Sequence, residues 1–201
     1  MAKKAKEEVE EIKVILLGDS GVGKTNLINV SLGHKFDETM EVTINPSYSA
    51  VNIKLDKKEY LLNLWDTAGQ EKYRRVTKLF FKGSEIIILV YDITNSTSFE
   101  SLQNWYQECE DIIDSPHIYG VVGNKNDKYQ EQQVEEKKAK EFAESINSPF
   151  QILSAKETPQ LFSELLKQLT ENYIKNNVCK RRNSVKLNNS TKPINKKGCC
   201  D

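Results

Sequence analysis

Residues 18–25 constrain this 201-residue chain most, because they read Gly-Asp-Ser-Gly-Val-Gly-Lys-Thr between an apolar run and an apolar-periodic stretch. A strand, a glycine-rich loop and a helix in this order form a phosphate cradle. The glycines let the backbone aim successive N–H groups inward, and the helix beginning near Lys24 adds the positive end of its dipole. Lys24 is expected to reach the outer phosphates, and the hydroxyl of Thr25 to bind Mg²⁺. A nucleoside triphosphate site is therefore predicted, rather than a glycine turn without a ligand.

The zero formal net charge conceals two parts of opposite sign. From Lys175 onward there are eight basic residues and one acid, whereas the preceding part has 21 basic and 28 acidic residues. A basic tail on an acidic body is typical of a protein that approaches an anionic surface. Because the tail lacks interleaved aromatic residues, lipid is favoured over nucleic acid as that surface.

The cysteines and the N-terminus indicate where the protein acts. No segment reaches the ~18 apolar residues of a membrane span, and the N-terminus leads into an acidic stretch instead of a signal-peptide core. A cytosolic protein is expected, and Ala2 excludes N-myristoylation. Cys109 and Cys179 stand alone, whereas Cys199 and Cys200 are adjacent at the end, which suits neither a disulfide scaffold nor a zinc site. The terminal pair points to lipid modification.

Short apolar runs alternate with helical patterns along the chain. The runs are β-branched and uninterrupted, as expected for parallel strands covered on both faces, and lie at 12–17, 86–91 and 118–122. Apolar residues recur at intervals of three and four over 99–113 and 161–173, which predicts two amphipathic helices. The second helix is expected to open with Thr158 as N-cap and Pro159 at its first position.

A hairpin is predicted from 47–55 and 59–65, and it supplies the one antiparallel edge strand. The whole pattern predicts an α/β fold with a six-stranded, mostly parallel sheet and about five helices. After about Asn176 the sequence becomes polar and basic, which predicts a disordered tail. The expected organisation is an N-terminal extension at 1–9, one domain at 10–175 and a basic tail at 176–201.

A further motif follows the predicted strand that ends at Trp65, where ligands sit in a sheet of this kind. The carboxylate of Asp66 can hold a Mg²⁺-bound water, and Gly69 can offer its N–H to a terminal phosphate. Gln70 can orient an attacking water. These residue types in this order indicate hydrolysis of the bound nucleotide.

Two more motifs follow later strands and concern the base. They are Asn-Lys-Asn-Asp at 124–127 and Ser-Ala-Lys at 154–156, the latter after an expected strand at 150–153. A carboxylate accepts two hydrogen bonds from N1–H and N2–H₂ of guanine, and adenine lacks that pair of donors. Asp127 therefore predicts selection of guanine, since a buried polar group left unpaired is costly.

In their order and spacing, these motifs resemble those of the Ras-like small GTPases over residues 10–175. The runs WDTAGQEKYR at 65–74, FFKG at 80–83 and VYDIT at 90–94 are most similar to the Rab branch. Only 26 residues separate Asp127 from Ser154, which leaves no room for the extra helix of Rho proteins. The resemblance implies the P-loop NTPase G-domain fold, GTP/GDP as ligand and Mg²⁺ as cofactor.

The resemblance also implies roles for single residues at the phosphates. Lys24 would contact the β- and γ-phosphates. The hydroxyls of Thr25 and Thr43 would bind Mg²⁺ directly, and Asp66 would act through water. Gln70 would position the attacking water, so that Gln70, Lys24 and Thr43 form the implied catalytic set.

At the base, the resemblance implies that Phe36 packs edge-on over guanine. Asn124, the stem of Lys125 and the N–H of Ala155 would complete the pocket around Asp127. The full set of implied nucleotide contacts is Ser20, Gly21, Val22, Gly23, Lys24, Thr25, Asn26, Phe36, Thr43, Gly69, Asn124, Lys125, Asp127, Ser154, Ala155 and Lys156.

The sequence departs from the family pattern just after Thr43, where it reads Ile-Asn-Pro-Ser-Tyr and lacks the usual glycine and acidic residue. Pro46 fixes its own φ and removes a donor, which alters the effector face without touching the Thr43 hydroxyl. Two functions stay open on these residues. One is a GTPase switch that is slow without an activating protein, since no cis arginine is evident. The alternative is a GTP-occupied binding module with negligible hydrolysis.

The C-terminus resembles the double-cysteine end of Rab proteins, with Cys199 and Cys200 both geranylgeranylated. Gly198 occupies the fourth position from the end, so a C-a-a-X box is excluded. Two lipid chains assisted by nearby lysines would give stable but extractable anchoring. The implied location is the cytoplasmic face of intracellular membranes, with a soluble cytosolic pool.

The resemblance implies protein partners as well. They are a guanine-nucleotide exchange factor, a GTPase-activating protein, a Rab escort protein and a GDP-dissociation inhibitor. Effector proteins would bind at the switch face, where Tyr48, Trp65 and Phe80 match an aromatic cluster. We expect a monomer that does not bind nucleic acid.

Overall fold

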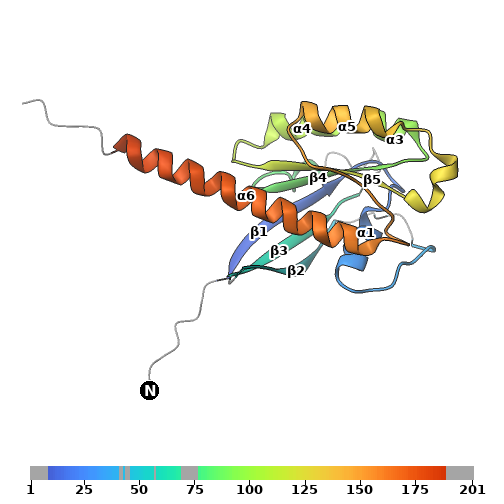
Figure 1. Cartoon of the computed structure of the whole chain (residues 1–201), viewed down its shortest axis with the longest axis horizontal. Helices are drawn as coiled ribbons and strands as arrows, with labels where there is room; N and C mark the ends of the chain where they lie inside the picture. Colours follow the sequence, from blue (N-terminus) through green and yellow to red (C-terminus); the bar gives the residue numbers. More distant parts are fainter. Residues whose placement is uncertain (1–8, 41–42, 44–45, 57, 69–76, 189–201) are drawn as a thin grey trace, which may run out of the picture.

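One mixed β-sheet organises the molecule (Figure 1). The structure is a computed structural model that describes residues 9–40, 43, 46–56, 58–68 and 77–188, with side chains as far as residue 177. Its strands are β1 Glu10–Leu17, β2 Ser47–Leu55, β3 Lys58–Asp66, β4 Ile86–Asp92, β5 Ile118–Asn124 and β6 Phe150–Ile152. They lie in the order β2-β3-β1-β4-β5-β6, and of these pairings only β2 with β3 is antiparallel. The predicted six-stranded, mostly parallel sheet is confirmed.

The strand sequences account for this layout. Every residue of β4 is buried, and β5 is buried from its second residue on, as expected for parallel strands with helices on both faces. β2 alternates half-buried and exposed residues along most of its length, which is typical of an edge strand. Its register with β3 runs from Ser47 opposite Asp66 to Leu55 opposite Lys58, so the predicted hairpin is confirmed.

Helices cover both faces of the sheet. They are α1 Lys24–Ser31, α3 Ser96–Glu100, α4 Leu102–Ile112, α5 Glu136–Ser145 and α6 Pro159–Asn188, together with the 3₁₀ helix η2 Asn126–Glu131. α1 and α6 lie on one face, and α3, α4 and α5 lie on the other (Figure 1). The sequence predicts one helix over 99–113, but the structure has two, α3 and α4, with Ser101 between them. α3 begins before Phe99 because the side chain of Asn95 accepts a hydrogen bond from Ser98 N.

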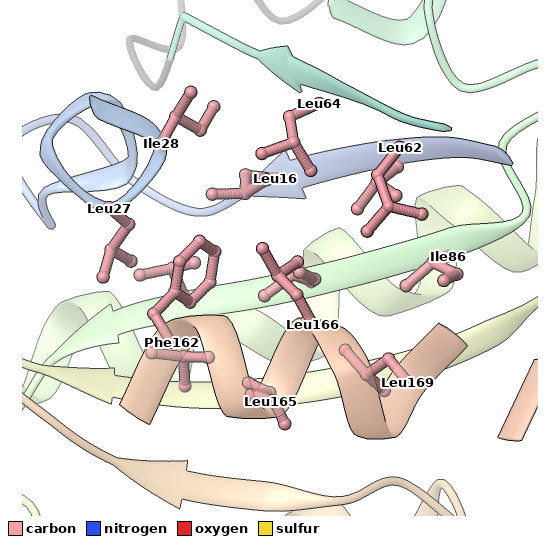
Figure 2. Close-up of a cluster of buried hydrophobic side chains, with 14 of the residues drawn as sticks. Leu16, Leu27, Ile28, Leu62, Leu64, Ile86, Phe162, Leu165, Leu166 and Leu169 are labelled. Carbon is pink, nitrogen blue, oxygen red and sulfur yellow. The ribbon is translucent and has the colours of Figure 1, made fainter. Parts of the chain in front are cut away.

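Two apolar cores lie between the sheet and these helices. In the first, Leu16 of β1, Leu27 of α1 and Leu166 of α6 point toward one another and are fully buried (Figure 2). The second core contains Cys109 of α4, which is buried as a small apolar residue, and burial raises the pKa of its thiol. The first core fixes α1, and with it the phosphate loop, against the carboxyl ends of the strands.

Helix α6 continues farther than the sequence predicts. It opens at Pro159 as expected, while the hydroxyl of Thr158 accepts a hydrogen bond from Ser154 N at 2.9 Å. The sequence predicts that a disordered tail starts at about Asn176. This start is too early, because the helix runs on to Asn188 and projects past the sheet (Figure 1). Extending a helix that packing has already nucleated adds little cost per residue, and no proline occurs between Pro159 and Pro193.

The tail beyond Asn188, including Cys199 and Cys200, lies outside the described residues. Within the described part of the chain, no helix combines the length and the apolar character that a membrane crossing requires.

Candidate nucleotide-binding site

A pocket opens at the carboxyl edge of the sheet, where a ligand is expected in an α/β fold. It is lined by residues from the phosphate loop, the segment after α1 and the two later motifs. Of the predicted contacts, the lining contains Ser20, Gly21, Gly23, Lys24, Thr25, Asn26, Phe36, Thr43, Asn124, Lys125, Asp127, Ala155 and Lys156. Segments more than a hundred residues apart in the sequence thus form one site.

Some predicted residues are placed elsewhere. Val22 and Ser154 are buried behind the pocket wall, where they bind other site residues. Gly69 and Gln70 lie outside the described residues. The lining also contains residues that were not among the predicted contacts, namely Glu38, Met40, Thr67 and Lys128. Thr67 belongs to the run at 65–74, whereas only nearness in the sequence to predicted contacts could have suggested the other three.

The phosphate loop requires glycine where the chain turns into α1. Gly23 has a φ of 97°, and a Cβ atom at this position would lie 2.3 Å from Nδ2 of Asn124. No side chain fits there without displacing the asparagine. The close approach explains the glycine beside Lys24 and leaves the backbone N–H groups at the helix start accessible to an anion.

Lys24 is held inside the loop. Its Nζ donates hydrogen bonds to the carbonyl oxygens of Gly18 at 2.7 Å and Asp19 at 2.9 Å. Burial lowers the pKa of this ammonium group to about 8, and the negative charges of Asp66 and Asp19 oppose that shift. A desolvated cation beside a glycine-rich turn attracts a polyphosphate.

The three predicted metal ligands meet at one point. The hydroxyl of Thr25 lies 2.8 Å from that of Thr43 and donates to Oδ2 of Asp66 at 2.8 Å. Thr43 donates to the same oxygen at 3.2 Å. Oδ1 of Asp66 is buried and has no hydrogen-bond partner among the described residues. Burial raises the pKa of this carboxyl group, while the Thr25 hydrogen bond and the Lys24 charge oppose the rise.

This oxygen set fits a hard divalent cation. Two hydroxyls and a carboxylate with one buried, unpaired oxygen match the ligands that Mg²⁺ prefers. The unpaired oxygen carries a desolvation cost that a cation, or a water bound to it, would remove.

The end of the pocket that contains Asp127 depends on Ser154. Its hydroxyl donates to Oδ1 of Asp127 at 2.6 Å and accepts from the N–H groups of Lys156 and Glu157 at 3.1 and 3.0 Å. The Asp127 carboxylate is therefore held by the neighbouring loop. Lys125 has a φ of 68°, and its Nζ lies 2.7 Å from Oδ2 of Asp92, which draws the charged end of the side chain to that carboxylate.

Asn124 joins the phosphate loop to the base loop. Its Nδ2 donates to the carbonyl of Val22 at 2.8 Å, and its Oδ1 accepts from the N–H of Ala155 at 3.1 Å. Only 2% of the residue is exposed, so both bonds are shielded from water. The Ala155 N–H that the resemblance assigns to the base thus supports the pocket through Asn124.

Comparison with known proteins agrees with this geometry. A family model described as the Ras family matches residues 13–175 of this chain. The chain belongs to the Ras family. Similar relatives include GTP-binding protein ypt1 of Schizosaccharomyces pombe, 37% identical over 188 residues that cover 89% of this chain and 91% of the relative. Ras-related protein Rab-7a of Paramecium octaurelia is 37% identical over 171 residues, which cover 81% and 83%.

A third relative is Ras-related protein RABA1f of Arabidopsis thaliana, 37% identical over 172 residues that cover 84% of this chain and 79% of the relative. These relatives place the chain in the Rab branch that the motifs indicate. Its ligands are guanine nucleotides, and its reaction is the hydrolysis of GTP to GDP and phosphate.

One contact to the phosphate loop of this Ras-family chain comes from the opposite face of the sheet. Nε1 of Trp105, in α4, donates to Oδ1 of Asp19 at 3.0 Å, although only 2% of the tryptophan is exposed. The helical periodicity around Trp105 predicts burial, but nothing in it reveals a polar partner so far away in sequence. The bond keeps the Asp19 side chain on the α4 side of the loop.

The aromatic residues of the expected effector face lie together. The ring centroids of Tyr48 and Trp65 are 5.5 Å apart, and those of Trp65 and Phe80 are 5.1 Å apart. Tyr48 is 62% exposed and the nearby Leu79 is 77% exposed, so apolar surface faces the solvent here. Such a surface is suited to binding a protein.

Proposed function

We propose that this chain is a membrane-anchored, Mg²⁺-dependent GTP switch of the Rab type. The observation that carries the proposal is the meeting of Thr25, Thr43 and Asp66 beside the buried Lys24. Thr43 comes from the segment between α1 and Tyr48. A bound nucleotide that fixes the position of Thr43 therefore also affects the adjoining effector face. Asp127, at the other end of the pocket, supports guanine as the base.

The residues divide the work of phosphoryl transfer. The phosphate loop and Lys24 would hold the β- and γ-phosphates. Thr25 and Thr43 would bind Mg²⁺ through their hydroxyls, and Asp66 would act on it through a water. When bound, the ion neutralises charge on the phosphate oxygens. Gln70 is assigned the role of orienting the attacking water because it lies four residues after Asp66. Because the chain itself offers no evident arginine for the transition state, an activating protein is expected to supply the missing charge.

A single-turnover experiment tests the proposed hydrolysis. Protein loaded with GTP and Mg²⁺ is incubated, and the bound nucleotide is separated by chromatography at intervals. We expect slow conversion to GDP that stops when Mg²⁺ is chelated, because the ion stabilises the transferring group. Unchanged GTP over many hours would favour the alternative, a GTP-occupied binding module, which the departure at Asn45 and Pro46 motivates. The Rab-type relatives favour hydrolysis.

We further propose the regulators that such a switch requires. An exchange factor and a GTPase-activating protein would act at the pocket, and effectors at the surface of Tyr48, Trp65 and Phe80. A Rab escort protein and a GDP-dissociation inhibitor would handle the lipidated tail. The exposed aromatic surface and the basic C-terminus support these assignments.

The proposed anchor predicts a change in location. Replacing both terminal cysteines, Cys199→Ser and Cys200→Ser, is expected to move the tagged protein from intracellular membranes to the cytosol. One lipid chain gives only marginal binding, so each single variant should show a partial loss. The measurement is membrane fractionation with microscopy, with Cys179→Ser as the matched cysteine control. Equal membrane distribution of wild type and double variant would contradict the lipid anchor.

A further inference from the structure

The side chain of Asn26, in the first turn of α1, binds the backbone of a residue outside the helix. Its Nδ2 donates to the carbonyl oxygen of Asp37 at 2.9 Å, and its Oδ1 accepts from Asp37 N at 3.2 Å. Both polar groups of the amide are thus paired with the backbone of one residue, as a neighbouring strand would pair with it. This reciprocal geometry orients residue 37 more strictly than a single hydrogen bond would.

Further contacts hold the same segment, residues 36–40. Asn29 lies one turn after Asn26 on α1, and its Nδ2 lies 3.6 Å from the sulfur of Met40. From the base loop, Nζ of Lys156 lies 3.8 Å from Oε1 of Glu38 and 6.0 Å from the centroid of the Phe36 ring. The segment is therefore contacted both from α1 and from the loop that supports Asp127.

The segment is also closed on itself. Oδ1 of Asp37 accepts hydrogen bonds from the N–H and the hydroxyl of Thr39, at 2.8 and 2.7 Å. These bonds lower the pKa of the Asp37 carboxyl group, and they form a turn fixed by its own side chain. A stiff turn transmits the position of residue 37 to its neighbours Phe36 and Glu38, both of which line the pocket.

From these contacts we propose that Asn26 is a positioning residue that fastens residues 36–40 over the base end of the pocket and so slows the release of guanine nucleotide. The proposal rests on the nucleotide binding of this family and adds the side chain that keeps the pocket closed. Because the fastened segment carries Phe36 and pairs with Lys156, it acts on the base and ribose end. Release of GDP and of GTP should therefore be slowed to a similar degree.

Asn26→Ala tests the proposal without weakening the helix, because alanine has the highest helix propensity. Protein loaded with a fluorescent GDP derivative, or with a fluorescent non-hydrolysable GTP analogue, is mixed with excess unlabelled nucleotide in Mg²⁺. Loss of the two hydrogen bonds between Asn26 and Asp37 is expected to raise the release rate about 3- to 10-fold for both nucleotides. In parallel, hydrogen exchange should show lost protection of the Asp37 amide, with protection of the amides of α1 retained.

Asn63→Ala is the matched control. Asn63 is a half-buried asparagine of β3 whose Nδ2 donates to Oε2 of Glu11 at 3.1 Å, and it does not line the pocket. We expect wild-type release from this variant. A general loss of folding stability would accelerate release in either variant. Faster hydrogen exchange at the Asp37 amide is expected only in Asn26→Ala.

Three results would overturn the positioning role. They are wild-type release from Asn26→Ala, acceleration for only one of the two nucleotides, and equal acceleration in Asn63→Ala. Failure of the wild type to retain fluorescent GDP would instead overturn guanine-nucleotide binding itself. The wild-type measurement separates these two failures.

Discussion

The variant Asp127→Asn is expected to bind GDP and GTP about 10²- to 10⁴-fold more weakly and to gain affinity for xanthosine nucleotides. The Asp127 carboxylate accepts from two guanine donors, N1–H and N2–H₂. An asparagine keeps one acceptor and turns the other oxygen into a donor, which opposes the exocyclic amine of guanine. Xanthine carries an oxygen in place of that amine and therefore matches the new side chain.

The structure explains why the exchange should leave the site intact. Ser154 donates its hydroxyl hydrogen to Oδ1 of Asp127, and an asparagine oxygen at the same place accepts that bond equally well. The N–H groups of Lys156 and Glu157 still pair with the Ser154 oxygen. The amide nitrogen is then left at the position of Oδ2, so only the pattern presented to the base changes.

Equilibrium competition against a fluorescent nucleotide measures both affinities. Glu131→Gln is the matched control, because Glu131 is an exposed acid of the same 3₁₀ helix and does not line the pocket. It should bind GTP like the wild type. If Asp127→Asn keeps wild-type affinity for GTP, or gains none for xanthosine nucleotides while its melting temperature is unchanged, direct reading of the base by Asp127 is wrong.

The second large effect concerns the chemical step. Gln70→Leu is expected to lower hydrolysis stimulated by an activating protein about 10³-fold or more, with GTP binding retained. Leucine has a similar volume but cannot orient the attacking water. The prediction depends on the position of Gln70 after β3, since residue 70 lies outside the described residues.

Phosphate release over many turnovers measures this effect, with and without an activating-protein domain that stimulates the wild type. Gln107→Leu provides the same chemical change on the exposed side of α4, where Gln107 hydrogen-bonds to Asp111. That control should be stimulated like the wild type. Undiminished stimulation of Gln70→Leu would show that another group positions the water.

Much of the fold could be read from local patterns. The uninterrupted runs at 86–91 and 118–122 became β4 and β5, because strands that are buried on both faces need apolar side chains at every position. The hairpin likewise followed from alternation around a short polar turn. The end of α6 could not be read in this way, since polar residues continue a helix once its apolar face is packed.

Much of the site could also be predicted, because backbone chemistry fixes the spacing of its motifs. A phosphate loop needs glycines at set intervals before a lysine, and motifs after parallel strands meet at one edge of the sheet. Thr25 and Asp66 were therefore expected together and lie 2.8 Å apart between their side-chain oxygens. The exact partners of Asn124 were not, since its bonds to Val22 and Ala155 depend on how two loops pack.

The sequence by itself determined that a phosphate chain and a guanine base are the ligand chemistry of this protein, and it predicts lipid modification at the C-terminus, because each signal is encoded by residue types at short, fixed spacing. Tertiary structure alone decided how the site is supported. Trp105 reaches Asp19 across 86 positions, and Asn26 reaches Asp37 across 11. Neither contact follows a local repeat, because the distance between such side chains is set by the packing of whole elements, and packing is the property that a linear pattern does not contain.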